Sequence, residues 1–206
     1  MILEDYKNKI KDKEVISMLK DTEEASVRLI GIVNDFLEVS RLEQGDISFK
    51  NAEFDIVEAT EKIENSLKNA IKNKDLSFEI INPGKDFPKI FADKTRVEQV
   101  LLNLLGNSIK FTEKGTISVS FEVIDNYIKV RVSDTGKGIS AKSENLLFRK
   151  FQPAGEEILV HDVTKNTGLG LYISKIIIEQ MGGFIGLEKS EEGVGSVFFF
   201  TIPIHS

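Results

Sequence analysis

Two asparagines, Asn103 and Asn107, lie four positions apart in "NLLGNSIKFT", a segment that otherwise has the apolar character of a buried helix. Residues four apart stack on one helix face, so we expect the two carboxamides side by side. Asparagine is a poor helix former, and capping of neighbouring loops is the structural alternative. A carboxamide oxygen is a hard, neutral ligand of the kind that Mg²⁺ takes beside phosphate oxygens. We therefore expect Asn107 to bind Mg²⁺, Asn103 to hold a metal-bound water or a phosphate, and Lys110 to add positive charge towards the phosphates.

A first glycine-rich segment, "SDTGKGIS" at 133–140, directly follows a predicted strand. This order places Asp134 at the strand end, with its carboxylate facing a loop. An ionised carboxylate only accepts hydrogen bonds, so it suits the exocyclic amine of adenine. Gly136 and Gly138 would let the backbone approach a flat base closely.

A second glycine-rich segment, "KNTGLGLYIS" at 165–174, opens a predicted helix. The first amides of a helix lack intrahelical partners and lie at its positive dipole end, which favours phosphate. Neither segment matches the Walker-type loop or the dinucleotide fingerprint, and either one alone fits a plain tight turn. Taken with the asparagines, they predict one magnesium–nucleotide pocket.

Composition narrows the class of protein. The 206 residues carry a net charge of -6, which argues against a nucleic acid partner, because phosphate backbones need a basic surface. The chain has no cysteine, so disulfides and thiolate metal sites are excluded. The run "VFFFTIPI" is far shorter than the ~20 apolar residues of a membrane span, and no signal peptide precedes the first helix. We expect a cytoplasmic chain without membrane contact in this fragment, although the full-length protein could be membrane-anchored.

Residues 14–43 predict one long amphipathic helix that ends at Gly45, a plausible C-cap. Its apolar residues repeat every seven positions, which favours packing against another helix in a bundle or coiled coil. The alternative is a helix that lies on its own domain. We expect a homodimer through residues 14–43. The repeat consists of Val15, Thr22, Leu29 and Phe36 on one heptad position and Met18, Ala25, Ile32 and Val39 three residues later.

The remaining chain mixes strands and helices in an order that predicts an α+β sandwich. A short strand and a helix occupy "AEFDIVEATEKIENSLKNAIKNK", and "LSFEIIN" is a strand. The helix that carries the asparagines spans 94–111, and alternating apolar residues predict a β-hairpin over 115–134. Residues 140–167 are mostly loop, a helix follows from about 168 to 181, and two strands, 184–190 and 195–203, close the fold.

Five segments resemble, in order, the N, G1, F, G2 and G3 boxes of bacterial sensor histidine kinases. They are "RVEQVLLNLLGNSIKFT", "DTGKGI", "LLFRKF", "NTGLGLYISK" and "EGVGSVFFFTIP", which lie within residues 93–203. In addition, "SVRLIGIVNDFLEVSRLEQG" resembles the second helix of the family's dimerisation and phosphoacceptor domain. Five boxes in the family's order are highly specific, whereas any one of them would not be.

The resemblance implies a two-layer α/β sandwich of the GHKL (Bergerat) type, preceded by a dimerisation helix. It implies the end of the helical hairpin at 1–46 and a catalytic ATP-binding domain at 47–206, with ATP and Mg²⁺ as ligands. It assigns Asn107 to the metal, Asn103 and Lys110 to catalysis, and Asp134 to the adenine amine. It also assigns nucleotide-binding roles to Gly136, Gly138, Phe148, Phe151, Thr167, Gly168, Leu169 and Gly170, with a lid at 152–167.

The chain departs from the family in its histidines. The only two are His161, in the expected lid, and His205, and neither has the surroundings of the phosphoacceptor. We therefore expect a fragment that begins just after the acceptor helix, binds ATP·Mg and does not phosphorylate itself. Pro153 also replaces a basic residue of the family, which leaves Arg149 or Lys150 to reach the γ-phosphate.

The resemblance implies transfer of the ATP γ-phosphoryl group to a histidine on the acceptor helix, and then relay to an aspartate of a response regulator. One alternative is an ATP hydrolase of the gyrase and chaperone type. Those enzymes carry a glutamate as general base where Asn103 stands, and a carboxamide takes no proton near neutral pH. A second alternative is a non-catalytic nucleotide-binding or dimerisation module.

Overall fold

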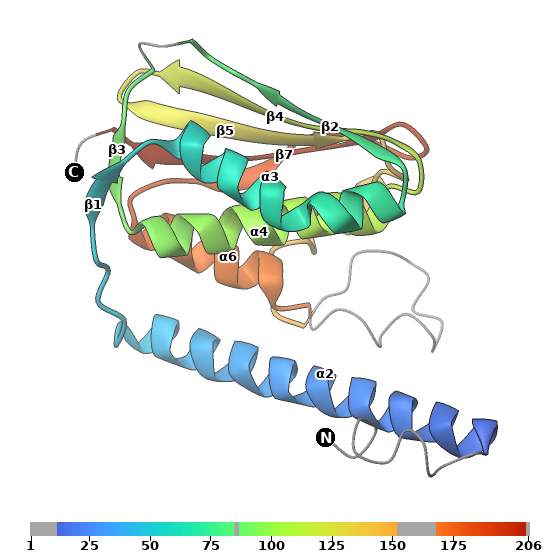
Figure 1. The fold of residues 1–206 in the computed structure, drawn as a ribbon. Coiled ribbons are helices and arrows are strands. Elements are labelled where there is room, and N and C mark those ends of the chain that lie inside the picture. The colour runs from blue at the N-terminus through green and yellow to red at the C-terminus, as the bar shows by residue number, and fades with distance from the viewer. Residues whose placement is uncertain (1–11, 85–86, 152–167, 205–206) are drawn as a thin grey trace.

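The computed structural model describes residues 12–84, 87–151 and 168–204. In chain order the elements are α2 (Lys13–Gln44), β1 (Ala52–Phe54), α3 (Ile56–Asn73), β2 (Leu76–Ile81), β3 (Ile90–Ala92), α4 (Lys94–Phe111), β4 (Gly115–Ile124), β5 (Tyr127–Asp134), α5 (Ala141–Glu144), α6 (Gly170–Gln180), β6 (Ile185–Glu191) and β7 (Gly195–Pro203). A five-stranded sheet carries α3, α4 and α6 on one face, and α2 lies beyond that helix layer (Figure 1). The two-layer α/β sandwich with a preceding long helix is confirmed.

The sheet has the order β2-β4-β5-β7-β6. β4 and β5 form the predicted hairpin, and Asp125 adopts a left-handed backbone (φ 53°) in its turn. β5 pairs with β7 and β7 with β6, both antiparallel. β2 pairs with β4 in parallel, a long-range pairing that hairpin patterns do not predict.

Aspartate side chains start the three long helices. Asp12, Asp55 and Asp93 are the N-caps of α2, α3 and α4, and each carboxylate accepts a hydrogen bond from an amide of its helix's first turn. This satisfies amides that have no partner within the helix. Among the described helices, none has the length and apolar character that a membrane crossing requires.

The core lies between the sheet and the helix layer. Strand side chains alternate, so one face of β4, β5 and β7 is buried while the other faces solvent. α4 lies centrally under this face, and its apolar residues fill the space against the strands. The buried apolar residues of these three strands are Ile117, Val119, Phe121, Ile128, Val130, Val132, Phe198, Phe200 and Ile202.

The last turns of α2 pack on this body. Val39 and Leu42 are buried, and the Gln180 side chain at the end of α6 donates a hydrogen bond to the Leu42 carbonyl at 2.8 Å. Gly45 has a left-handed backbone (φ 72°), which confirms the predicted C-cap. Val39 is a residue of the heptad stripe, so this end of the stripe packs on the chain's own body, beside α6.

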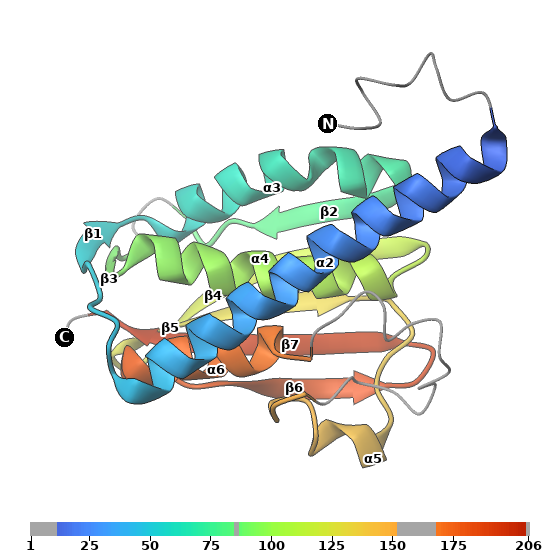
Figure 2. The same cartoon turned by 90° about the horizontal axis from the view of Figure 1, so that it is seen from below.

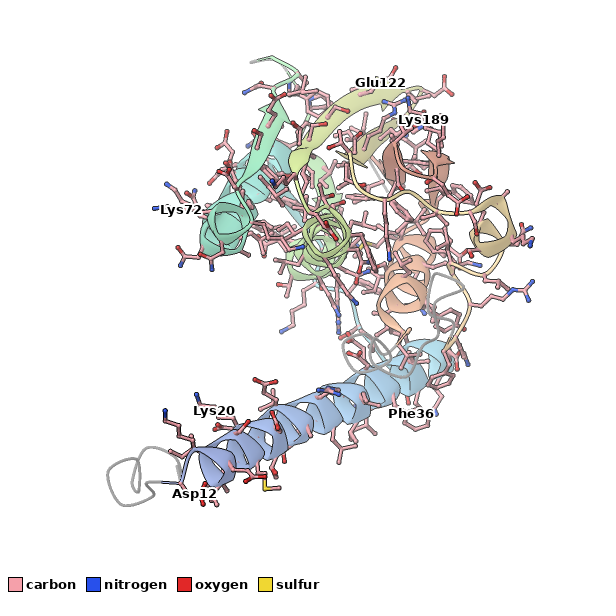
Figure 3. The ribbon with its side chains drawn as sticks, turned by 90° about the vertical axis from the view of Figure 1, so that its right-hand side faces the viewer. Asp12, Lys20, Phe36, Lys72, Glu122 and Lys189 are labelled. Carbon is pink, nitrogen blue, oxygen red and sulfur yellow. The ribbon has the colours of Figure 1, made fainter. Side chains whose placement is uncertain are left out.

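The rest of the heptad stripe is open to solvent. Met18 is 61% exposed, Leu29 62% and Phe36 56%. Figure 2 shows α2 crossing the helix layer obliquely, and Figure 3 shows its Asp12 end standing clear of the body. A long apolar surface of this kind is unusual for a helix that stays alone in water.

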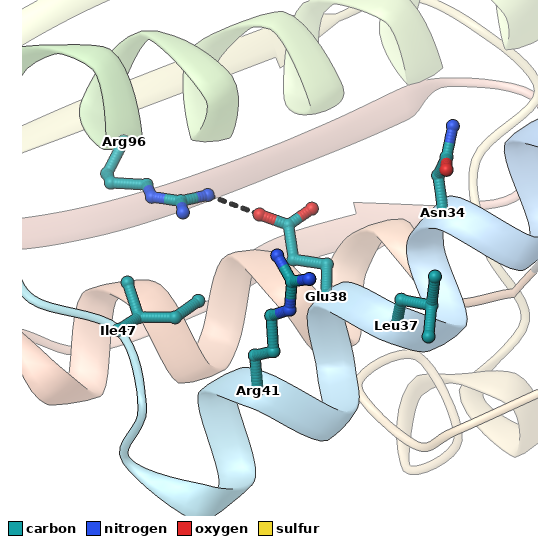
Figure 4. Close-up of a pocket in the computed structure, with 6 residues that line it drawn as sticks. All are labelled: Asn34, Leu37, Glu38, Arg41, Ile47 and Arg96. Atoms are coloured by element: carbon teal, nitrogen blue, oxygen red, sulfur yellow. Dashed lines mark hydrogen bonds and ion pairs between the residues drawn. The ribbon is translucent and has the colours of Figure 1, made fainter.

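Polar side chains join α2 to the start of α4. Arg96 donates to the carboxylate of Glu38, and Gln99 donates to the same carboxylate at 2.9 Å. Beside this contact lies a cavity of about 250 Å³ (Figure 4), lined by Asn34, Leu37, Glu38, Arg41, Ile47 and Arg96. None of the predicted site residues lines it.

Two short elements lie outside the predictions. β3 has three residues and pairs with β1, and α5 is one turn of helix within the segment expected to be mostly loop. α6 runs from Gly170 rather than Gly168, because Gly168 has a left-handed backbone (φ 67°). The first eleven residues of the helical hairpin expected at 1–46 lie outside the described residues.

Candidate functional site

α4 places the asparagines at the edge of the core. Most of its apolar residues are buried, whereas Asn103, Asn107 and Lys110 are half-buried on a different side of the same helix. Spacings of four and three residues keep the three side chains on one face, as predicted. The face therefore runs along α4 as a polar strip beside the core.

Asn103 lies against the first turns of α6. Its side-chain amide donates a hydrogen bond to Ser174 Oγ at 2.9 Å. A Cβ at Gly170 would lie 2.4 Å from Asn103 Oδ1, so a side chain there would displace the Asn103 amide. This contact joins two predicted site residues, and it shows Ser174, four residues after Gly170, as a contributor that the sequence analysis missed.

Asp134 ends β5 and is buried next to the same helix. Its carboxylate accepts hydrogen bonds from the Gly136 amide at 3.0 Å and from Ser108 Oγ at 3.2 Å. Burial raises the pKa of Asp134 above its ordinary value, and the bonds from Gly136 and Ser108 partly offset that rise. Ser108 was not predicted, although it follows Asn107 directly in the sequence.

Gly136 and Gly138 belong to the loop after Asp134, and side chains would not fit at either position. A Cβ at Gly136 would lie 2.6 Å from the Phe111 carbonyl and 2.9 Å from Thr112 Oγ1. Gly138 has φ 70°, and a Cβ there would lie 2.0 Å from the Glu191 carbonyl. The loop is therefore pressed against the end of α4 on one side and against the β6–β7 turn on the other.

Thr112 presents a hydroxyl into this corner. Its Oγ1 is the one buried side-chain polar atom within the described residues that has no hydrogen-bond partner. A buried hydroxyl without a partner costs free energy, so its position beside Gly136 indicates a place where a polar ligand atom or a water would bind. Nothing in the sequence distinguishes Thr112 from an ordinary residue after a helix.

The start of α6 is built without a side-chain cap. Leu169 is buried as its N-cap residue and offers no side-chain acceptor to the amides of the first turn. Gly168 turns the chain into the helix with its positive φ. Thr167, predicted to meet phosphates, lies outside the described residues, as do the expected lid at 152–167 and both histidines.

The two phenylalanines of the expected lid anchor differ. Phe148 is half-buried, and its ring meets that of Phe198 edge-on with centroids 6.4 Å apart. Phe151 is 55% exposed and has a left-handed backbone (φ 56°). In this arrangement Phe148 is anchored in the core and Phe151 is not.

Basic side chains gather near the same corner. The ammonium groups of Lys110 and Lys137 each lie 5.0 Å from the centroid of the Phe111 ring. Lys150, one of two residues considered for the γ-phosphate, is instead 2.6 Å from Glu43 at the end of α2. Arg149 is exposed.

Within the described residues, no cluster of three His, Cys, Asp or Glu side chains could hold a metal by itself. The oxygen donors near the site are amides and hydroxyls on α4, plus the buried Asp134. Such a set suits Mg²⁺ only when phosphate oxygens supply the remaining ligands.

The site therefore brings two other chain segments to α4. The end of β5 contacts α4 through Asp134 and Ser108, and the start of α6 contacts it through Gly170 and Asn103.

Residues 92–206, more than half of the chain, match the model of the histidine kinase-, DNA gyrase B- and HSP90-like ATPases. The chain belongs to this family.

Curated relatives are histidine kinases. The chain is 30% identical over 204 residues to the autoinducer 2 sensor kinase/phosphatase LuxQ of Vibrio vulnificus, which covers 96% of the chain and 24% of that protein. It is 33% identical over 192 residues to the signal transduction histidine-protein kinase BarA of Escherichia coli, which covers 90% of the chain and 20% of that protein. The chain thus spans about a quarter or less of these relatives.

Solved structures of histidine kinases have a fold similar to that of this chain. Full-length ShkA in complex with AMPPNP superposes with a TM-score of 0.78 at 28% identity, covering 96% of this chain and 40% of that one. The histidine kinase ThkA in complex with the response regulator protein TrrA superposes with a TM-score of 0.70 at 25% identity, covering 98% of this chain and 55% of that one. The family's ATP-binding module, expected from the five boxes, is confirmed.

Proposed function

We propose that this chain binds ATP together with Mg²⁺ and transfers the γ-phosphoryl group to a histidine on another segment or chain. The observation that carries the proposal is the double contact of α4. One helix contacts the buried Asp134 through Ser108 and the start of α6 through Asn103. A single nucleotide that lies along α4 would therefore meet an adenine acceptor at one end and a helix N-terminus at the other.

Asp134, Gly136 and Thr112 form the proposed base site. The carboxylate of Asp134 accepts a hydrogen bond from the adenine amine, and Gly136 lets the base lie against the backbone. Thr112 Oγ1, which lacks a partner, supplies one more polar contact, direct or through water. The close approach at Gly138 keeps the loop in its shape.

The phosphates lie beside the middle of α4, where Asn103 and Asn107 face the start of α6. The first turn of α6, entered through Gly168 and Leu169, directs backbone amides towards them, and Lys110 neutralises charge. Asn107 provides an amide oxygen for Mg²⁺, which when bound would neutralise charge on the phosphate oxygens. Asn103 fixes the first turns of α6 relative to α4 through Ser174 and Gly170.

The transfer needs little covalent chemistry from the protein. A nitrogen lone pair of the acceptor imidazole attacks the γ-phosphorus, the bond to the β–γ bridging oxygen breaks, and ADP leaves with that electron pair. The other ring nitrogen of the imidazole then releases its proton. The role of the chain's residues is to align the phosphate and to stabilise its charge.

A hydrolase is the second candidate, and the contacts of Asn103 disfavour it. Hydrolysis by the gyrase-type route needs a base to take a proton from water, and the Asn103 amide already donates to Ser174. Steady release of phosphate from ATP without any acceptor, lost on Asn103→Ala, would support the hydrolase instead.

The exposed stripe of α2 supports dimerisation. Met18, Leu29 and Phe36 lie open on a helix whose other side contacts α6. We infer a dimeric helical stem, with residues 1–46 belonging to it and residues 47–206 to the catalytic body. A response regulator, as seen bound to ThkA, would take the phosphoryl group from the histidine. ATP supply places the module on the cytoplasmic side.

The decisive experiment adds a separate fragment that carries an acceptor-histidine helix, together with labelled ATP and Mg²⁺. We expect acid-labile phosphohistidine on the fragment and none on this chain. Asn107→Ala and Asp134→Ala should abolish the label, and Asp134→Ala should also weaken ATP binding in a titration. Asn65→Ala, a matched change at an exposed asparagine of α3, should keep both. Full ATP affinity in the Asp134→Ala chain contradicts the adenine assignment.

A further inference from the structure

Lys74 is the residue where α3 ends, and its side chain reaches the end of a different helix. Its backbone amide donates to Ile71 in the last turn of α3 at 3.2 Å. Its ammonium donates three hydrogen bonds to carbonyls at the end of α4: Ile109 at 2.7 Å, Lys110 at 2.8 Å and Thr112 at 3.2 Å. Lys74 therefore caps the C-termini of two helices, α3 through its backbone and α4 through its side chain.

These bonds complete the C-terminus of α4. The Ser108 carbonyl accepts from the Thr112 amide at 3.0 Å, and the Phe111 carbonyl accepts from the Lys137 amide at 3.2 Å. Lys74 bonds the other three carbonyls between Ser108 and Thr112. The last carbonyls of a helix otherwise lack partners, and a cation is favoured there by the helix dipole.

The Lys74 ammonium has three donors, and this arrangement uses all of them. Among the described residues no carboxylate pairs with it, so its positive charge is committed to backbone carbonyls. Because no N–H remains, Lys74 does not itself reach a nucleotide. Any effect that it has on the site must act through the end of α4.

The end of α4 also contacts the adenine loop, residues 134–138, whose Asp134 is the proposed adenine acceptor. The Phe111 carbonyl accepts a hydrogen bond from the Lys137 amide. A Cβ at Gly136 would also clash with the Phe111 carbonyl and with Thr112 Oγ1. A shift of this last turn would displace the loop that carries Asp134, and it would move Lys110 as well. Lys74 therefore contacts the last turn of α4, and this turn contacts the adenine loop and carries Lys110.

We propose that Lys74 is a positioning residue for nucleotide binding, which holds the last turn of α4 so that the Asp134–Lys137 loop keeps its shape. The proposal rests on the ATP-binding function proposed above. It distinguishes Lys74 from Lys72, another lysine in the last turns of α3. Lys72 is exposed and points away from the body (Figure 3).

The test compares ADP affinity in Lys74→Gln, Lys74→Met and the control Lys72→Met, at a temperature where circular dichroism shows each variant folded. We expect Lys74→Met to weaken binding about fivefold or more, as is typical of coupled sites, and Lys74→Gln, which keeps two donors, to fall between. Lys72→Met should bind like the unsubstituted chain. A purely structural role would lower the unfolding temperature and leave the affinity of the folded protein unchanged.

A second measurement follows amide hydrogen exchange. In the Lys74 variants the Lys137 amide should exchange about tenfold faster or more, while amides between β5 and β7 keep their protection. If Lys74→Met does not fold, Lys74→Gln decides. A folded Lys74→Gln chain with unchanged ADP affinity and unchanged Lys137 exchange overturns the inference. Failure of the unsubstituted chain to bind ADP would instead overturn the proposed function.

Discussion

Two parts of the molecule hold helices in place by different means. At the end of α4, buried backbone groups, Asp134 and closely approached glycines form contacts in which almost every polar atom has a partner. At the end of α2, the contact combines the two buried residues Val39 and Leu42 with charged side chains at the surface. There Glu43 accepts from Tyr172 at 2.6 Å and pairs with Lys150.

The difference indicates that the contacts at the end of α4 stay fixed, whereas those at the end of α2 can separate. Buried hydrogen bonds are expensive to leave unsatisfied, and close packing next to glycine leaves no room for movement. Surface ion pairs contribute little and weaken with salt. We therefore expect the nucleotide corner to remain rigid while the rest of the chain separates from α2, as the proposed transfer to a histidine on another segment would require.

The largest effect is expected from glycine substitution in the rigid corner. Gly138 and Gly45 have nearly the same backbone, φ 70° and 72°, but a Cβ at 138 would meet the Glu191 carbonyl while a Cβ at 45 would meet nothing within 4 Å. Gly138→Ala should destabilise the chain by about 2–4 kcal/mol and Gly45→Ala by about 1–2 kcal/mol, since only the first adds a clash to the backbone strain. Denaturant unfolding measures both, and equal losses would contradict the crowded corner.

The next effect concerns Asp134, whose carboxylate is costly to bury. Asp134→Asn should weaken ATP binding about tenfold or more, because a charge-assisted acceptor becomes a neutral one. The same change should leave the unfolding temperature of the nucleotide-free chain unchanged or higher, since burial disfavours the charged form. Loss of stability with unchanged affinity would mean that Asp134 has a structural role only. Calorimetric titration and thermal unfolding separate these results.

The sequence predicts most of the helices and strands, and several of the predicted site residues lie together beside α4. Helical and alternating apolar patterns placed α2, α3, α4 and the β4–β5 hairpin, and the glycine spacings placed the loops around Asp134 and Gly170. These features are local, so a short window of residues contains the whole signal.

The missed residues share a different property. Ser174 bonds Asn103 across 71 positions, and Lys74 bonds the end of α4 across 35 to 38. Such partners are ordinary serines and lysines until the chain is folded, because the contact depends on how distant elements pack. β3 was not predicted for a different reason, because a strand of three residues is too short to show an alternating pattern.

A smaller effect is expected from pH. Burial raises the pKa of Asp134 above its ordinary value, so on acidification this carboxyl gains its proton at a higher pH than an ordinary aspartate. Protonation removes the negative charge and places an O–H donor on one carboxyl oxygen, which weakens acceptance from the adenine amine, so ATP affinity should fall as pH drops through that raised pKa. The ratio of affinities between the unsubstituted chain and Asp134→Asn cancels the protonation of ATP itself. This ratio should shrink towards one at low pH, and a constant ratio would contradict the assignment.

The smallest effect is expected at the stem contact. The Lys150 ammonium and the Tyr172 hydroxyl hold the pKa of Glu43 below its ordinary value, so the pair persists as pH falls until that lowered pKa is reached. Glu43→Gln should leave the unfolding temperature nearly unchanged, because the charged groups are exposed. It should nevertheless lengthen the average distance between spin labels on α2 and on the outer face of the sheet, for example at Lys20 and Lys189 (Figure 3). High salt should lengthen the distance in the unsubstituted chain and change it little in the variant. An unchanged distance under both conditions would show that the Glu43 contacts do not hold the stem, which the buried Val39 and Leu42 and the hydrogen bonds of Glu38 and Gln180 then hold as firmly as the end of α4 is held.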